Sequence, residues 1–459
     1  MSTLPVVETP NFIQFFHWVL NPTDFMETYY KKYGDIFATE GLWSAGAPLL
    51  MLSEPDAIKQ MLSRDSGRVF SAPGEINEIL EPLLGRQNLM LLSGQAHRNR
   101  RRLVLPHFHG GRIQLYGQII QQITQAVVDH WSDQQIRDTR PMMQTITMRV
   151  ILQAVFGLYG GERYERLEKL LAQRLDITNS PLASMLLFIP WLQQDFGEWS
   201  PGARLSKLAK ETDDLLFSVI RERRDELNTD RQDILSLLLA ATDEEGKGLS
   251  DQEVRDELMG LLVAGHETTA TALTWALYWI HSVPAVKAKL MDELSAIANP
   301  NDPAEIMKCP YLEAVCCETL RIHPVAMLLF PRRVEVPVEL SGYALEQGTL
   351  VMGSIYLVHQ REDLYPNPKQ FRPERFLERQ FSSFEFMPFG GGARRCVGSA
   401  LAMYELKIVL GTLLTQLDLS LENKLPVKPR RRGVTLGQDQ SVLLKKVQTI
   451  TPQRSLVEV

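Results

Sequence analysis

The chemistry of this chain centres on Cys396. The thiol follows a glycine-rich bend, Gly390-Gly391-Gly392, and precedes a predicted helix over residues 400–417. Unpaired backbone N–H groups at a helix start, together with the helix dipole, favour a thiolate over a thiol. Arg394 stands two residues before Cys396, and no second cysteine or histidine is close in the sequence. This arrangement suits the single axial ligand of a haem iron, because a thiolate donates electron density that favours O–O cleavage.

Cys396 has two alternative interpretations, part of a phosphate-binding loop or an inert buried cysteine. A glycine run before a helix can cradle a phosphate, but the lysine and the Ser/Thr of a P-loop are absent here. A buried and inert cysteine is the commonest fate of this residue type. Burial alone would not require three consecutive glycines, which cost backbone entropy. We therefore favour the haem-thiolate interpretation over an inert thiol.

A long helix is predicted over residues 251–282 to position the second group of candidate residues. Ser250 and Glu253 form a capping box at its start, and Pro284 follows its end. At about 1.5 Å per residue, such a helix would span nearly ~50 Å and cross a large domain. Its middle carries Ala264-Gly265-His266-Glu267-Thr268-Thr269. Glycine and polar residues are poor choices in mid-helix, and local rules broken in a core element indicate a functional site.

An acid–alcohol pair is the catalytic interpretation of this segment. Ala264 and Thr268 are four residues apart and share a helix face, which makes a recess with a hydroxyl at its edge. Glu267 could pass protons from solvent, and the activation of dioxygen consumes protons. The alternative is a packing glycine and a threonine bonded back to its own i−4 carbonyl. Because Cys396 is present, we favour the catalytic interpretation of this segment. His266 has two interpretations: it lines the cavity, or it is a core histidine whose hydrogen bonds are satisfied.

The residues around the thiol also match a known pattern. The sequence Phe389-x-x-Gly392-x-Arg394-x-Cys396-x-Gly398 resembles the haem-binding signature of the cytochrome P450 superfamily. The resemblance implies haem b, with Cys396 as the axial iron ligand and the other signature residues at the cofactor. It also implies that Ala264, Glu267 and Thr268 belong to the oxygen-activation segment of a monooxygenase.

Three further residues resemble the structural salt-bridge network of the superfamily. Glu318-Thr319-Leu320-Arg321 matches its Glu-x-x-Arg helix, and Arg375 lies in a proline-stiffened loop some 50 residues later. The resemblance implies that Glu318, Arg321 and Arg375 hold the thiolate loop in place and take no part in the chemistry. Charges that satisfy one another avoid the cost of a lone buried ion.

The two haem propionates require cations and hydrogen-bond donors. Arg394 matches a propionate ligand of the superfamily, and His97 with Arg101, four residues later, resembles a second propionate-binding pair. Arg332 matches a third position, although Arg333 is only one residue away. For His97 a surface position is the alternative, because arginines crowd this part of the sequence.

The expected fold is mainly α with a minor β part, built as one large cytochrome P450-type domain with the long helix over the haem. The domain is expected to span 1–459, with 1–32 as an N-terminal lead-in and no reductase domain. Apolar periodicity extends over most of the chain, and alternation appears in a few short segments. The predicted helices are 54–62, 117–131, 142–156, 161–175, 205–227, 234–241 and 251–282, and the predicted strands are 34–39, 49–52, 334–340 and 344–352.

Composition limits the other functional classes. The net charge of −6 gives no support for nucleic-acid binding, and the basic runs 98–102 and 428–432 are expected to be solvated. The apolar stretch 12–20 is too short for a membrane anchor, which needs about 20 apolar residues. Four cysteines in 459 residues do not form a disulfide framework. A soluble, cytoplasmic monomer is expected.

The substrate is expected to be apolar. The segments that face substrate in the superfamily map onto 70–92, 176–199 and 325–330, which are rich in apolar residues. The sequence near 429–434 resembles that of soluble cyanobacterial members, which are associated with the oxidation of fatty acids, alkanes or terpenoids. Hydroxylation of a long-chain lipid is therefore the expectation. The alternatives are a haem-thiolate sensor or carrier without turnover, and a member that catalyses dehydration or C–C cleavage.

Electrons are expected from a separate ferredoxin and its reductase, because no flavin or iron–sulfur extension follows Cys396 in this sequence. Small ferredoxins are acidic, so a basic patch would speed their docking. Arg395, Lys407 and the run 428–432 are the predicted members of that patch.

Overall fold

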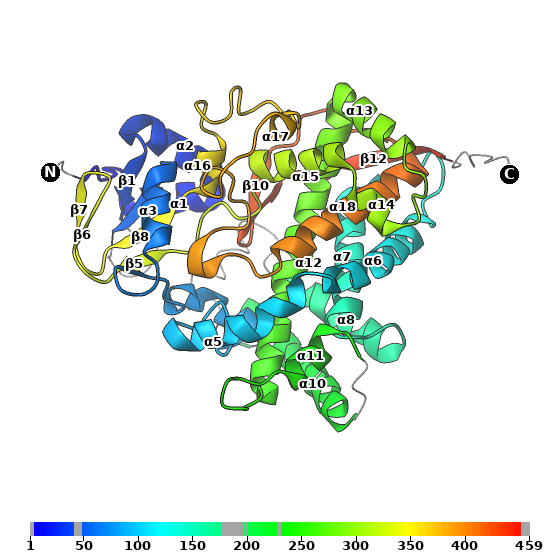
Figure 1. The fold of residues 1–459 in the computed structure, drawn as a ribbon, viewed down its shortest axis with the longest axis horizontal. Helices are drawn as coiled ribbons and strands as arrows, with labels where there is room; N and C mark the ends of the chain where they lie inside the picture. Colours follow the sequence, from blue (N-terminus) through cyan, green and yellow to red (C-terminus); the bar gives the residue numbers. More distant parts are fainter. Residues whose placement is uncertain are drawn as a thin grey trace.

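Helices dominate the computed structural model (Figure 1), which describes residues 4–40, 48–176, 194, 196–197, 200–226 and 231–450. Most of the helices lie on one side of the molecule, and the sheet that contains β1, β5 and β8 lies on the other. The helices are α1 (Asn11–Leu20), α2 (Pro22–Tyr33), α3 (Pro55–Ser63), α4 (Glu81–Leu84), α5 (Gly94–Val104), α6 (Arg112–Val128), α7 (Thr139–Ala154), α8 (Glu162–Asp176), α10 (Pro201–Asp225), α11 (Ile234–Ala240), α12 (Asp251–Ser282), α13 (Pro284–Ser295), α14 (Pro303–Met307), α15 (Pro310–Ile322), α16 (Ile355–His359), α17 (Arg375–Glu378) and α18 (Ser399–Gln416), with short 3₁₀ turns η1 (Glu75–Leu80), η2 (Leu105–Phe108) and η4 (Gly392–Arg394).

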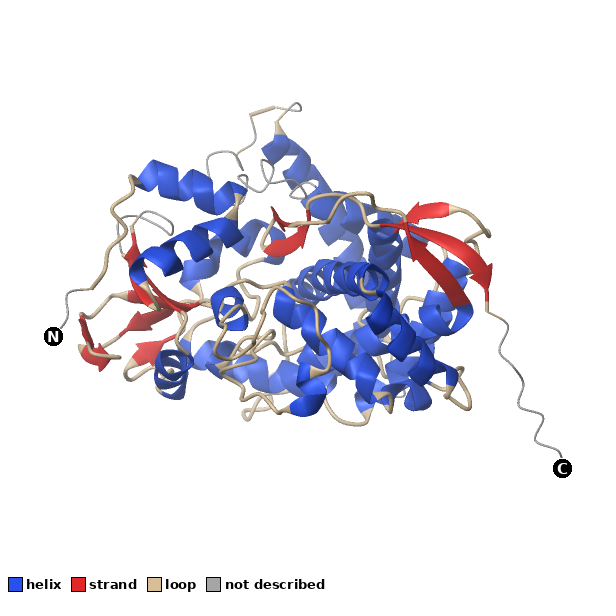
Figure 2. Ribbon diagram, turned by 90° about the horizontal axis from the view of Figure 1, so that it is seen from above, coloured by secondary structure: helices blue, strands red, loops and turns tan. Residues whose placement is uncertain are grey.

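The strands form small sheets, most of them towards the two sides of the helical body (Figure 2). The largest sheet has the order β1-β2-β8-β5-β3, in which β2 and β8 are parallel and the other pairs are antiparallel. Two smaller sheets have the orders β4-β12-β9 and β6-β7, and β10 and β11 form a separate hairpin. The strands are β1 (Ile36–Thr39), β2 (Leu49–Leu52), β3 (Phe70–Ser71), β4 (Ile136–Asp138), β5 (Arg332–Val334), β6 (Val338–Leu340), β7 (Tyr343–Leu345), β8 (Leu350–Gly353), β9 (Leu417–Leu421), β10 (Pro429–Arg432), β11 (Thr435–Gln438) and β12 (Leu443–Thr449).

Helix α12 runs through the middle of the structure (Figure 1). It begins at Asp251 and ends at Ser282, which confirms the predicted bounds. The capping box is present: Glu253 N–H donates to Ser250 Oγ at 3.3 Å, and Ser250 N–H donates to the Glu253 carboxylate at 2.9 Å. These two bonds satisfy N–H groups that the first turn of any helix leaves without intrahelical partners. Pro284 begins α13, so the chain turns directly after α12 ends.

Two apolar clusters fix α12 against its neighbours, because burial of apolar surface is the main driving force of folding. The larger cluster joins the second half of α12 to α6, α7, α15 and α18, with Ile120, Ile146, Leu273, Leu312 and Leu410 all fully buried. The second joins the first half of α12 to α8, α10 and α11. Helices α12 and α18 are therefore held rigidly, which matters because both carry site residues.

Several predictions from the sequence need correction. The strand predicted over 334–340 is two strands in different sheets, β5 and β6, because Pro337 between them lacks the N–H that a continuous ladder requires. The strand predicted over 344–352 is likewise divided into β7 and β8 by a turn in which Gly348 has a φ of +90°. Most of the predicted substrate-facing segment 176–199 lies outside the described residues. The other predicted helices and strands are confirmed within a few residues of their bounds.

Two members of the basic patch predicted to dock a ferredoxin are buried, so that part of the prediction is wrong. Lys407 is only 1% exposed on α18, where its ammonium donates to Met307 O at 2.7 Å and pairs with Glu313 at 3.2 Å. Arg431 is 3% exposed. Among the helices of the described residues, none is both long enough and apolar enough to cross a bilayer.

Candidate functional site

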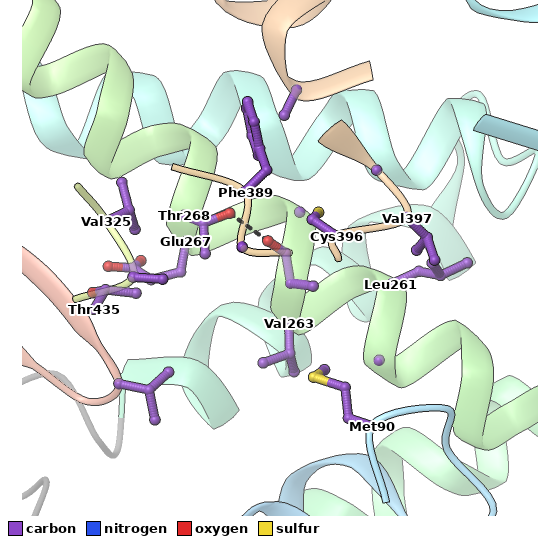
Figure 3. Close-up of a pocket in the computed structure, with 18 of the residues that line it drawn as sticks. Met90, Leu261, Val263, Glu267, Thr268, Val325, Phe389, Cys396, Val397 and Thr435 are labelled. Atoms are coloured by element: carbon purple, nitrogen blue, oxygen red, sulfur yellow. Dashed lines mark hydrogen bonds between the residues drawn. The ribbon is translucent and has the colours of Figure 1, made fainter. Parts of the chain in front are cut away.

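A cavity of about 490 Å³ lies between α12, the Cys396 loop and the β10–β11 hairpin (Figure 3). Most of the candidate site residues line it. Residues from 77–90 and 325–331, the first turns of α18 and parts of α5 and α7 also line it. The predicted site residues in the lining are His97, Arg101, Ala264, Glu267, Thr268, Phe389, Arg394, Cys396 and Gly398.

The Cys396 loop is shaped by a close approach at Gly392. This residue has a φ of +64°, which only glycine adopts readily, and a Cβ added here would overlap with the Asp65 carboxylate. That carboxylate accepts from Ala393 N–H at 2.9 Å and pairs with Arg332 at 2.8 Å. The glycines therefore allow the loop to pack against an ion pair, which explains their presence more directly than a phosphate cradle does.

The Cys396 sulfur is exposed to the cavity, from a loop enclosed by protein. Its backbone N–H donates to Phe389 O at 2.9 Å, and Gly398 is the N-cap residue of α18. Burial raises the pKa of the Cys396 thiol, although the Gly398 N–H and the charges of Arg101 and Arg395 lower it. Burial and the loop donors thus act in opposite directions on this sulfur. The charge of a haem iron, when bound, would favour the thiolate form.

Thr268 and Ala264 lie on the face of α12 that borders the cavity, which Cys396 also lines. Figure 3 shows Thr268 and Cys396 in this lining. The Thr268 hydroxyl donates to Ala264 O, as the alternative interpretation required, yet the same side chain lines the cavity. Its two lone pairs are left to accept hydrogen bonds from a bound molecule. The back-bond and a role at the cavity are thus compatible, and Ala264 leaves space beside the hydroxyl.

Glu267 lies where α12 meets the start of α7. Its carboxylate pairs with Arg140 and accepts from Gln144 Nε2 at 3.0 Å, and the residue also borders the cavity. It therefore connects the cavity wall with polar groups of α7. His266 contacts α7 instead: its Nδ1 lies 2.9 Å from Thr147 Oγ1, the residue is 3% exposed, and it is absent from the described cavity lining. His266 is a hydrogen-bonded core histidine.

Cations gather at another part of the cavity wall. Burial, together with the nearby charges of Arg394, Arg101 and Arg332, lowers the pKa of His97 to about 3. Arg394 donates to three backbone carbonyl oxygens, those of Ala72, Leu89 and Leu92. Arg332 is fully buried behind the loop, where it binds Asp65, and it is not part of the described cavity lining.

This donor set fits a haem. A sulfur ligand faces the cavity, and a group of cations that depress one another's pKa would be relieved by the two propionates of the porphyrin. His97, Arg101 and Arg394 line the cavity and would offer donors to those propionates, with His97 as a neutral imidazole. Arg332 supports the loop from behind.

The three predicted network residues contact one another away from the cavity. Glu318 accepts from Arg321 Nε at 2.7 Å and Nη2 at 2.9 Å, and from Arg375 Nε at 3.1 Å. Arg372 N–H donates to the same carboxylate at 2.9 Å. Glu318 and Arg321 are fully buried, and Arg375 is 4% exposed. The network fastens α15 to the segment that leads to the Cys396 loop.

Sequence reasoning missed several residues of the site. Asp65 has no local signal, because its partners Arg332 and Ala393 are hundreds of residues away. Arg140, which holds Glu267, has none either. Arg431 and Arg432 line the cavity, and the basic run 428–432 was their signal, but it was interpreted as a solvated surface.

Comparisons with known proteins agree with this geometry. The model of the family "Cytochrome P450" matches residues 5–444. A Mycobacterium tuberculosis protein described as "Putative cytochrome P450 135B1" is 36% identical over 414 residues, 90% of this chain and 84% of that protein. A Mycobacterium bovis protein described as "Putative cytochrome P450 138" is 32% identical over 435 residues, 94% of this chain and 93% of that protein.

The fold is that of a solved structure described as "Retinoic acid bound cyanobacterial CYP120A1". The TM-score is 0.84 at 22% identity, and the match covers 98% of this chain and 100% of the other. The chain therefore belongs to the cytochrome P450 family and is a haem-thiolate monooxygenase.

Proposed function

We propose that this monooxygenase hydroxylates a long-chain fatty acid, alkane or terpenoid, with haem b held by Cys396. The observation that carries the proposal is the cavity itself. It places a thiol, a hydroxyl-edged recess and a largely apolar wall around one space. The apolar residues of its lining include Ile79, Leu80, Leu83, Met90, Val325 and Leu328. Such walls favour apolar ligands, which a few polar groups then orient.

Haem b, when bound, supplies the oxidising chemistry, and the side chains around it bind and orient. Cys396 would hold the iron, and His97, Arg101 and Arg394 would bind the propionates. Thr268 would orient a hydrogen bond beside Ala264, and Glu267 would exchange protons between the cavity and the polar groups of α7. Glu318, Arg321 and Arg375 would keep the Cys396 loop in register.

Two of the three predicted substrate-facing segments support an extended apolar substrate. Residues from 77–90 and 325–331 border the cavity from two sides. The structure that shares this fold was solved with retinoic acid bound, an apolar body with an acidic end. A ligand of that general shape would suit a cavity with this lining.

We also propose a ferredoxin, served by its reductase, as the electron donor. The docking surface is different from the predicted one, because Lys407 and Arg431 are buried. Arg395 is exposed next to Cys396, and Arg98 and Arg102 are exposed on α5. The charge of Arg395 affects the pKa of Arg101, so the loop and α5 are close together. An acidic ferredoxin would be attracted to this surface.

A screen of lipids tests the proposed substrate class. Ligands that displace water from the iron shift its spin state, and those that bind are then incubated with a surrogate ferredoxin system. Hydroxylated products of fatty acids, alkanes or terpenoids are expected. Binding without an oxygenated product from any of them would favour a sensor or carrier. Products of dehydration or C–C cleavage would mean that the reaction is not the proposed hydroxylation.

A further inference from the structure

Residues 85–92, between α4 and α5, contribute Asn88, Leu89 and Met90 to the cavity wall. Figure 3 shows Met90 in this lining, and Met90 packs against the same small apolar cluster as Val263 of α12. The segment is a series of turns without helix or strand. Its position must therefore be fixed by contacts with neighbouring elements.

The segment lies directly against the first half of α12. A Cβ added at Gly260 would lie 2.0 Å from Asn88 Nδ2, so a larger residue there would push Asn88 away. Asn88 Nδ2 donates to Asp256 O at 2.9 Å, and Gln87 N–H donates to the Asp256 carboxylate at 2.8 Å. Both the main chain and a side chain of the segment are thus bound to α12.

Glu257 supplies the central contact of this wall. One oxygen of its carboxylate, Oε1, accepts from Leu89 N–H at 2.8 Å and from Arg100 Nη1 at 2.9 Å. Arg100 Nη1 also donates to Gln87 O at 2.7 Å, and Arg100 Nη2 pairs with Glu253. Glu257 is 2% and Arg100 5% exposed, so water cannot replace these bonds. The pair joins α5, α12 and the segment between them.

The Leu89 peptide also connects α12 with the Cys396 loop. While its N–H binds Glu257, its carbonyl oxygen accepts from Arg394 Nη1 at 3.0 Å. One peptide group is therefore held from two sides, by a carboxylate of α12 and by a guanidinium that lines the cavity. Loss of the contact on one side would release the wall that Leu89 and Met90 form.

The carboxylate of Glu257 is costly to bury. Burial raises its pKa to about 7, whereas Arg100 and the Leu89 N–H act in the opposite direction. Replacing a buried ion pair by apolar residues of similar volume is often neutral or stabilising. A gain in stability therefore explains this pair poorly, and a gain in position explains it better.

We propose that Glu257 is a positioning residue of the monooxygenase: through Leu89 and Arg100 it fixes residues 87–92 and so determines the affinity for substrates long enough to contact this wall. The inference rests on the proposed function and deepens it, because it takes the cavity to bind an extended apolar substrate. Glu257 acts through the Leu89 peptide and not on the substrate itself.

Hydrogen exchange with residue-level resolution tests the contact at pH 8, where the Glu257 carboxyl group is mostly ionised. In the wild type, Leu89 N–H should exchange slowly although it lies in a turn. Glu257→Met keeps the volume but removes the acceptor, and should speed this exchange roughly 10- to 100-fold, the factor for a hydrogen bond to a charged group. Glu257→Gln keeps an acceptor oxygen and should restore part of the protection.

Asp251→Asn is the matched control on the same helix, because its pair with Arg224 is 36% exposed on both sides. It should leave the exchange of Leu89 unchanged. Rapid exchange of Leu89 N–H in the wild type would overturn the proposal even if Glu257→Met does not fold, and so would equal exchange in Glu257→Met and the wild type.

Imidazole and 1-dodecylimidazole separate the wall from the iron, because both bind haem iron through nitrogen and only the second carries a chain that extends into the cavity. In optical titrations of the holoenzyme, we expect Glu257→Met to weaken dodecylimidazole roughly 10-fold and imidazole less than about twofold, with Glu257→Gln between Glu257→Met and the wild type. The CO-difference spectrum of the reduced protein checks folding.

An equal loss of affinity for both azoles, or no loss for either, would overturn the proposal. Azole binding requires no turnover. These shifts together with a lack of hydroxylated lipid products would therefore refute the proposed reaction and support the positioning role of Glu257.

Discussion

Replacing Glu318 with glutamine should destabilise the protein strongly, although Glu318 itself is not part of the described cavity lining. The Glu318 carboxylate accepts four hydrogen bonds, from Arg321 Nε and Nη2, Arg375 Nε and Arg372 N–H. A glutamine keeps the shape but removes the charge, and its NH₂ group turns a donor towards a guanidinium.

The expected loss follows from the burial of the network. Glu318 and Arg321 are fully buried and Arg375 is 4% exposed, so water cannot replace the lost charge. Removing one partner from a buried ion pair costs about 3–5 kcal/mol, because the remaining charge is left without compensation. We therefore expect Glu318→Gln to lower the free energy of unfolding by about 3–5 kcal/mol and to promote loss of haem, since the segment beyond Arg375 leads to the Cys396 loop.

Urea unfolding of the holoenzyme, together with its haem content, measures this effect. Glu378→Gln is the matched control, because it removes a neighbouring pair with Arg372 whose side chains are 40% and 54% exposed. Exposed pairs contribute about 0–1 kcal/mol, so the control should be nearly neutral. Similar stability and haem content in the two variants would refute the reasoning that the buried network secures the loop.

Three other perturbations address the cavity, a buried acid and a close backbone contact. Thr268→Ala should slow product formation roughly 10-fold or more, while the spin-state shift on ligand binding stays unchanged. An unchanged turnover rate would show that Thr268 has no catalytic role. Burial raises the pKa of Glu405 from 4.5 to about 8, so the native state binds this proton more tightly than the unfolded state does. The free energy of unfolding of the wild type should therefore fall as the pH rises from 4.5 to about 8. The fall is up to about 5 kcal/mol, and Glu405→Gln should flatten this part of the pH profile of unfolding; identical profiles would contradict the assignment. Gly74→Ala places a Cβ against the Leu91 carbonyl and should cost about 1–3 kcal/mol by thermal unfolding, whereas Gly111→Ala, where the space is open, should not.

Local signals account for the parts of the structure that the sequence predicted. The bounds of α12 follow from the capping box and Pro284, which act within a few residues of the helix ends. The Cys396 loop and the Glu318 network were identified from short motifs with fixed spacing. In each case the information needed lies close together in the chain.

Tertiary contacts account for what the sequence did not predict. Lys407 and Arg431 were expected on the surface because charged residues are usually solvated, but α18 is buried on all sides and the hairpin turns inward. The pKa of Cys396 depends on how deeply the loop is enclosed, which no local pattern reveals. Asp65 and Arg140 contribute only because distant segments meet.

The absorption spectrum of the reduced, CO-treated holoprotein tests most directly whether Cys396 is the iron ligand. We predict the red-shifted band that is typical of a thiolate opposite CO, and its loss in Cys396→Ser even where haem is retained. A properly folded wild-type holoprotein without this band, or a Cys396→Ser variant that keeps it, would contradict the account.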